Sequence, residues 1–177
     1  MGLIKARSRS LVAVLALIPL GLLPTTSSAT DLITQLDSAV ISMHDYSVIN
    51  GQITAKATDA TVQAAVSKMN RQLFTIKTNL TTFDAAVTQS WKFLSPKANG
   101  TYPARETMRQ FDLTAFAWYS YELNAQKKIV ECFKNTATSK QCVLKLKAKN
   151  KKVELAKYSK VTAQLNIIEK WRVIAKR

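Results

Sequence analysis

The chain has little of the chemistry on which most protein sites depend. Its 177 residues include one histidine and two cysteines, too few soft ligands for a four-ligand zinc site or an iron–sulfur cluster held by one chain. Four glycines and four prolines are also few for a turn-rich β-sandwich or a glycine-rich nucleotide-binding loop. These counts leave a small, mostly helical protein as the expected class, with no metal and no cofactor.

Groups able to carry catalysis are equally sparse. The single histidine, His44, leaves no room for most Ser-His-Asp or Cys-His arrangements, and no nucleophile stands out beside it. Asp112 and Glu122 lie ten positions apart, too far along one helix to share a proton. Haem ligation by Met43, His44 and Tyr46 is an alternative, but the sequence lacks the Cys-x-x-Cys-His motif that attaches haem. We therefore predict no catalytic residues and a protein that is not an enzyme.

Residues 1–29 have the layout of a secretory signal peptide. Three basic residues are followed by a 13-residue apolar run and then by small polar residues that end at Ala29. The run is shorter than the roughly 20 residues that a membrane-spanning helix needs. We predict cleavage after Ala29 and a secreted product, residues 30–177, in an extracellular, periplasmic or surface-associated location. An uncleaved anchor is the alternative.

Export affects how the two cysteines are interpreted. In an oxidising compartment, Cys132 and Cys142 are expected to form a disulfide around a short loop. The alternative is a catalytic thiol activated by His44. We predict the disulfide, because a thiol with an available partner is usually oxidised outside the cytoplasm.

Export also gives meaning to two Asn-x-Thr sequons. They begin at Asn79 and Asn99, and they matter only in a host that glycosylates exported proteins. Asn99 lies in the predicted loop and is the more accessible of the two.

Glycine, proline and one polar loop divide the predicted mature chain into four helical segments. They are 31–49, 59–94, 104–133 and 140–175. In the second segment, apolar residues recur at the spacing of one helix face: Val62, Val66, Met69, Leu73, Ile76, Leu80, Phe83 and Val87. We predict one all-α domain over residues 30–177, an up-and-down four-helix bundle with the disulfide in its third connection.

The second segment also bears on the shape of the bundle. A helix of about 35 residues is about 50 Å long, which exceeds the width of a compact domain of this size. We therefore expect either an elongated bundle or a bend near Thr81 and Thr82. Because the same spacing is typical of a coiled coil, the stripe suits a dimer as well as a core, and the oligomeric state stays open.

The fourth segment allows two interpretations. Between Val143 and Leu155, apolar residues alternate with lysines, a pattern that suits a strand or a hairpin around Asn150. A single ribbon on an otherwise helical chain is marginal in stability. We therefore favour a helix.

The formal net charge of +15 is concentrated in the last third of the chain. Residues 30–125 contain eight basic and eight acidic residues, whereas residues 126–177 contain fifteen basic and three acidic ones. The basic residues are densest in a cluster of five: Lys145, Lys147, Lys149, Lys151 and Lys152. Alternate residues of a helix point in different directions, so these lysines are expected to form a basic collar rather than one face.

This asymmetry favours an anionic partner. We expect a secreted, non-enzymatic binding protein whose region 126–177 associates, through these lysines, with an anionic polymer or an anionic membrane or envelope surface. Lysine outnumbers arginine there, and no aromatic residue lies between Cys142 and Tyr158, which argues against sequence-specific nucleic-acid binding. One alternative is a cationic membrane-active protein of the toxin or antimicrobial type.

A second alternative is a carrier of an apolar ligand. Aromatic residues gather in the third segment, where they would line a pocket: Phe111, Phe116, Trp118 and Tyr119. Aromatic side chains at these positions suit a hydrophobic core equally well.

Overall fold

A computed structural model describes most of the chain. It covers residues 29–92, 94, 105–134 and 138–175, and for residues 29–31 and 171–175 it describes the backbone alone. The predicted signal segment therefore lies outside the described residues except for Ala29, and so does the sequon at Asn99. The described part contains four α-helices and one 3₁₀ turn: α1 (Ala29–Gly51), α2 (Asp59–Ser90), α3 (Arg105–Glu131), η1 (Cys132–Lys134) and α4 (Ser139–Ala175).

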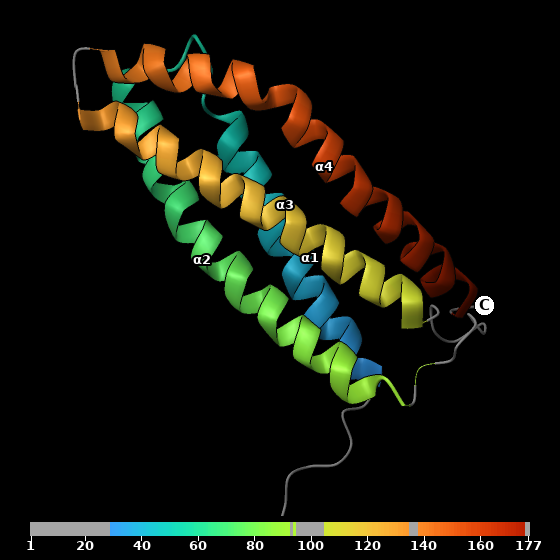
Figure 1. Ribbon diagram of the computed structural model, residues 1–177. Coiled ribbons are helices and arrows are strands. Elements are labelled where there is room, and N and C mark those ends of the chain that lie inside the picture. Colours follow the sequence, from blue (N-terminus) through green and yellow to red (C-terminus); the bar gives the residue numbers. More distant parts are fainter. Residues whose placement is uncertain (1–28, 93, 95–104, 135–137, 176–177) are drawn as a thin grey trace, which may run out of the picture.

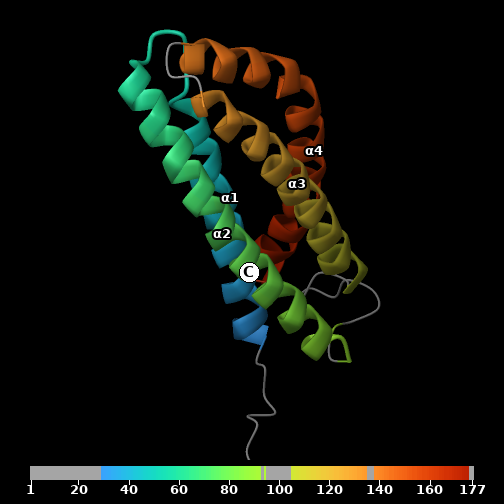
Figure 2. The ribbon, with the colours of Figure 1, turned by 60° about the vertical axis from the view of Figure 1, so that its left-hand side comes forward.

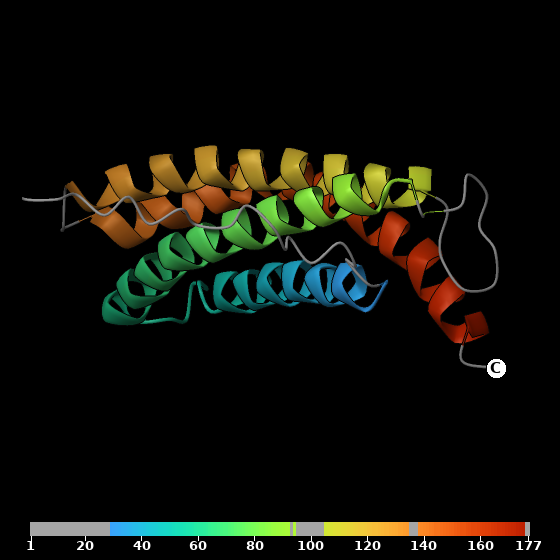
Figure 3. The same cartoon turned by 90° about the horizontal axis from the view of Figure 1, so that it is seen from below.

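The helices form an elongated up-and-down bundle, which confirms the predicted fold (Figure 1). Helices that follow one another along the chain pack together, and the α1–α2 hairpin lies beside the α3–α4 hairpin (Figure 2). Seen from below, α2 separates α1 from the α3–α4 pair (Figure 3). α2 has 32 residues and is about 48 Å long at 1.5 Å per residue, so the bundle is elongated because this helix is not interrupted.

α2 begins and ends for local reasons that its sequence contains. The Thr58 hydroxyl accepts a hydrogen bond of 3.1 Å from the amide of Thr61 and so caps the first turn. The helix ends at Ser90, four residues before the predicted boundary, and the amide of Trp91 donates to the carbonyl of Thr88. The eight apolar residues of the predicted stripe are all at most 5% exposed. They form the centre of the hydrophobic core.

α4 is one continuous helix from Ser139 to Ala175, so the strand or hairpin considered for residues 143–155 is wrong. The alternating pattern is misleading because several inward positions of this helix are polar. Between the buried side chains of Val143 and Val161, the partly buried positions include Lys147, Asn150 and Glu154. Their spacing of three and four residues is helical, although their polarity hides the stripe.

Cys132 and Cys142 form the predicted disulfide. The bridge joins η1 to the beginning of α4, across the third connection of the bundle. Because it uses both cysteines of the chain, the alternative of a catalytic thiol activated by His44 is wrong.

We expect the disulfide to stabilise the bundle without determining its fold. Replacement of both cysteines by serine should lower the free energy of unfolding by about 2.7 kcal/mol, the chain-entropy cost of opening a loop this short, and should leave the helical content unchanged. Urea unfolding followed by far-UV circular dichroism measures both quantities. A reducing agent should destabilise the native protein to the same extent and leave the serine variant unaffected.

Candidate functional site

The structure separates the five clustered lysines into groups with different surroundings. Lys145, Lys149 and Lys152 are exposed and follow one another at spacings of four and three residues along α4. Lys160, also exposed, continues the same side of the helix. We call these four residues the lysine face. At 3.6 residues per turn they fall within an arc of about 80° and extend along about 22 Å of the helix.

The lysine face is not neutralised by acidic residues of its own helix. Glu154 is the only acidic residue between positions 140 and 168, and helical geometry puts it on the side opposite Lys145. Its carboxylate accepts a hydrogen bond of 2.8 Å from the Asn50 amide of α1. The acidic group is therefore directed into the bundle, away from the exposed ammonium groups.

Lys147 is directed inward and has a structural role. Its ammonium group donates to the backbone carbonyl oxygens of Asn50, in the last turn of α1, and of Ile53, two residues beyond the end of the helix. Helix ends leave carbonyl groups without partners, and a cation there also interacts favourably with the helix dipole. Burial lowers the pKa of Lys147, and the carboxylates of Glu154 and Glu122 oppose that shift.

Lys151 lies between these two groups. With Lys147 and Glu154 it lines a cavity of about 350 Å³ that α4 forms with Asn50 and Gly51 of α1. Lys151 itself is exposed. The predicted basic collar is therefore divided into an outward lysine face, one partly buried lysine directed inward and one lysine at the edge of a polar cavity.

A buried carboxyl group, that of Glu122, interacts with the charges of Glu154 and Lys147 at this polar cavity. Glu122 of α3 accepts a hydrogen bond of 3.0 Å from the Tyr46 hydroxyl of α1. Burial, assisted by the charge of Glu154, raises the pKa of Glu122 to about 7. The Tyr121 hydroxyl also donates to the Asn150 carbonyl of α4. Polar side chains thus connect α1 and α3 and join α3 to α4.

The four aromatic residues predicted to line a ligand pocket belong to the core or pack against it. Phe111, Trp118 and Tyr119 are buried, and Phe116 is partly buried against them. The Phe111 ring meets Phe83 edge to face at a centroid distance of 5.4 Å. A core role accounts for all four residues.

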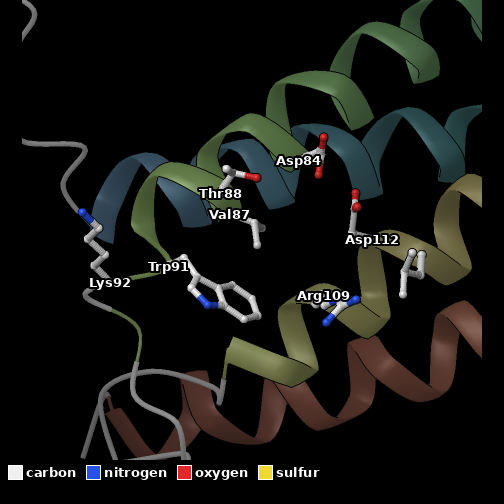
Figure 4. A pocket seen from close by; sticks show the side chains of 8 residues that line it. Asp84, Val87, Thr88, Trp91, Lys92, Arg109 and Asp112 are labelled. Atoms are coloured by element: carbon white, nitrogen blue, oxygen red, sulfur yellow. The ribbon is translucent and has the colours of Figure 1, made fainter.

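A further cavity, of about 450 Å³, lies between α2 and α3 (Figure 4). Val87, Trp91 and Leu113 supply its apolar lining, and Asp84 and Asp112 point toward one another at one side of it. Asp112 is only 8% exposed. Burial is the main cause that raises the pKa of Asp112 to about 7, and the Asp84 carboxyl group raises it further.

Sequence reasoning missed this carboxyl pair because it compared Asp112 only with Glu122 on the same helix. A signal was present in the helical period: Asp112 lies between Met108 and Ala115, three or four residues from each, on a side that is otherwise apolar. The helical period does not show which residue of α2 lies opposite Asp112.

Two minor interpretations are also decided by side-chain direction. Met43 and Tyr46 are buried whereas His44 is exposed, so the three do not converge on a haem iron. The described residues contain no group of three or more His, Cys, Asp or Glu side chains that could hold a metal ion.

The Asn79 amide nitrogen donates to the Ser38 carbonyl at 3.0 Å, so a glycan there would break a helix-to-helix hydrogen bond.

Comparison with known proteins adds no family to this description. No protein-family model, no curated protein and no solved structure matches the chain. Across the part of the chain that is described, no helix has both the length and the apolar character needed to cross a membrane.

The inward role of Lys147 predicts a difference between neighbouring lysines. Lys147→Met should lower the free energy of unfolding by about 2 kcal/mol, because two carbonyl groups at the end of α1 lose a charged donor. Lys149→Met removes the same charge from an exposed position and should change stability by no more than about 0.5 kcal/mol. Urea unfolding of the two variants tests this; equal effects would contradict the structural role.

The raised pKa of Glu122 predicts a pH dependence of stability. Between its ordinary value of 4.5 and about 7, the folded protein keeps a proton that the unfolded chain has released, so stability falls as pH rises through this window, by at most about 1.4 kcal/mol per pH unit. Glu122→Gln should remove that part of the decline and leave the part due to Asp112. Unfolding between about pH 4.5 and 8 measures it, with the exposed Glu106→Gln as control.

Proposed function

We propose that this is a secreted, non-enzymatic binding protein that associates with an anionic polymer or an anionic envelope surface through the lysine face of α4. The observation that supports the proposal is the exposed row of Lys145, Lys149, Lys152 and Lys160 on one side of a continuous helix. Point charges spread over about 22 Å of helix suit an extended partner that follows the course of α4. Each ammonium group that meets a phosphate or sulfate releases counterions, which supplies the binding free energy.

The composition of this surface favours charge attraction over recognition of a defined sequence. Lysine presents a hydrated point charge, whereas arginine would provide the planar fork that reads a base edge. Position 156 within the row is alanine, which leaves the neighbouring lysines unobstructed. No aromatic residue interrupts the row to act as a stacking platform.

Positive charge is distributed unevenly over the molecule, with an excess on one side. Residues 30–125 are balanced in charge, and Glu154 is held on the inner side of α4 by Asn50. The positive potential is therefore strongest on one side of the molecule. Such an asymmetric field orients an approaching polyanion and speeds its association at low salt.

Export is part of the proposal. The layout of residues 1–29 is that of a signal peptide, and a disulfide is typical of proteins in oxidising compartments. Polysaccharides and polymers rich in sulfate or phosphate, as well as anionic membrane lipids, are the chemical classes that such a surface would meet there.

Replacement of the lysine face tests the function. The fourfold variant Lys145→Gln, Lys149→Gln, Lys152→Gln and Lys160→Gln should elute from heparin and polyphosphate resins at lower salt than the native protein. The slope of log affinity against log salt should decrease by roughly 3, since each lost contact removes about 0.7 to 0.9. The matched control removes four exposed charges elsewhere: Lys56→Gln, Lys68→Gln, Arg71→Gln and Lys77→Gln.

The control distinguishes binding through a defined surface from binding that depends on net charge alone. If both variants weaken retention equally, the lysine face is not the binding surface. Dye-loaded vesicles containing phosphatidylglycerol test the membrane-active alternative, because a polymer-binding protein should leave them intact. Dye release at concentrations that saturate heparin would overturn the proposal in favour of membrane disruption.

A further inference from the structure

The cavity between α2 and α3 is a second feature that the lysine face does not use. Its inner surface combines the carbon surface of Val87, Trp91 and Leu113 with the carboxyl groups of Asp84 and Asp112. We call it the carboxyl cavity. At about 450 Å³ it has the size of a small-molecule site, and such sites typically pair an apolar lining with a few polar groups.

One oxygen of the carboxyl cavity lacks a partner. Asp112 is 92% buried, since its exposed fraction is 8%, and its Oδ1 atom has no hydrogen-bond partner among the described residues. A buried oxygen without a partner is costly, and native structures contain few of them. Because the residue lines the cavity, a bound donor could satisfy this atom without any change in the fold.

Acidic and basic residues both line the cavity. Asp84 and Lys92 come from the α2 side, and Arg109 and Asp112 come from α3. Burial and the neighbouring Asp84 carboxyl group both raise the pKa of Asp112. In Figure 4, Lys92 extends away from the two carboxyl groups. The inner end of the cavity is therefore acidic, although its rim also carries basic residues.

We propose that the carboxyl cavity binds a small organic amine, whose ammonium group donates to Asp112 and Asp84 while its apolar group lies against Val87, Trp91 and Leu113. An ammonium group brings three donors and a positive charge, so it can satisfy Asp112 Oδ1 and the facing carboxyl together. An alcohol brings one donor and no charge. A carboxylate would add a third acidic group to the inner end.

The tryptophan at the cavity already attracts a cation. The Arg105 guanidinium lies 5.4 Å from the centroid of the Trp91 ring, within the range of a cation–π interaction. The ring is half-buried and faces the cavity (Figure 4). The aromatic or alkyl group of an amine therefore meets an apolar ring surface at the cavity, of which one face is already covered by the Arg105 guanidinium.

Amine binding at this site should depend on pH in one direction. Below about pH 7 the Asp112 carboxyl keeps its proton, and an ammonium ligand must displace it. Above this value the carboxylate is ready to accept the ligand, whereas an alkyl amine, like a lysine side chain, stays charged to well above pH 8. Affinity should rise between about pH 5.5 and 8, and binding at the lower end should release a proton.

Calorimetric titration of the purified, disulfide-bonded protein with 2-phenylethylamine tests the proposal. We expect a Kd below about 1 mM and at least roughly tenfold weaker binding of 2-phenylethanol and of 3-phenylpropionate, because one lacks the charge and the other reverses it. Asp112→Asn should weaken amine binding at least about tenfold, whereas the matched Asp45→Asn, at an exposed position of α1, should bind as the native protein does.

The second carboxyl group keeps the test decisive if Asp112→Asn does not fold. Asp84 is exposed, so Asp84→Asn is expected to fold and to weaken amine binding as well. Failure of 2-phenylethylamine to bind, equal binding of the alcohol, or tighter binding of the carboxylate would each overturn the proposal. None of these outcomes bears on heparin retention by the lysine face, which is measured separately.

Discussion

The hydrogen bonds from Lys147 to the end of α1 constrain both the interior and the surface of this bundle. Among the described residues, the backbone of α1 packs closely only on α2, so side chains must connect it to the other hairpin. Lys147 provides one connection through two carbonyl groups, and Glu154 provides another through Asn50. Together with the buried side chains of Val143, Val161 and Ile168, these contacts orient α4 about its own axis.

That rotation decides which lysines reach solvent. With Lys147 and Glu154 directed inward, the helical period turns positions 145, 149 and 152 outward, because they lie on the opposite side of the helix. The same contacts therefore stabilise the end of α1 and create a row of exposed positive charge. A bundle in which Lys147 faced solvent would have to bury a different part of the basic cluster, at a cost that no partner in the core would offset.

The fold could be predicted from the sequence because its apolar pattern is strong where it matters most. The stripe of α2 from Val62 to Val87 is buried along its whole length, and the disulfide followed from the only two cysteines. The helix favoured for residues 143–155 is also confirmed, but the surroundings of its side chains could not be predicted where inward positions are polar. Lys147 and Glu154 interrupt the stripe of α4, and a period cannot reveal that their partner is the end of another helix. The Asp84–Asp112 pair was missed for the same reason, since packing between helices alone brings the two residues together.

The two buried carboxyl groups of α3, those of Glu122 and Asp112, differ in their surroundings. The difference favours a structural role for Glu122 and a ligand-binding role for Asp112. Glu122 is nearly enclosed and accepts a hydrogen bond from Tyr46, although its Oε1 atom, like Oδ1 of Asp112, has no partner among the described residues. Asp112 has a similarly raised pKa but borders an open cavity. The ionic contact proposed there involves a single ammonium group, whereas binding at the exposed lysine face releases counterions at four lysines and should therefore weaken more steeply as salt increases. Salt dependence thus distinguishes the two sites on physical grounds.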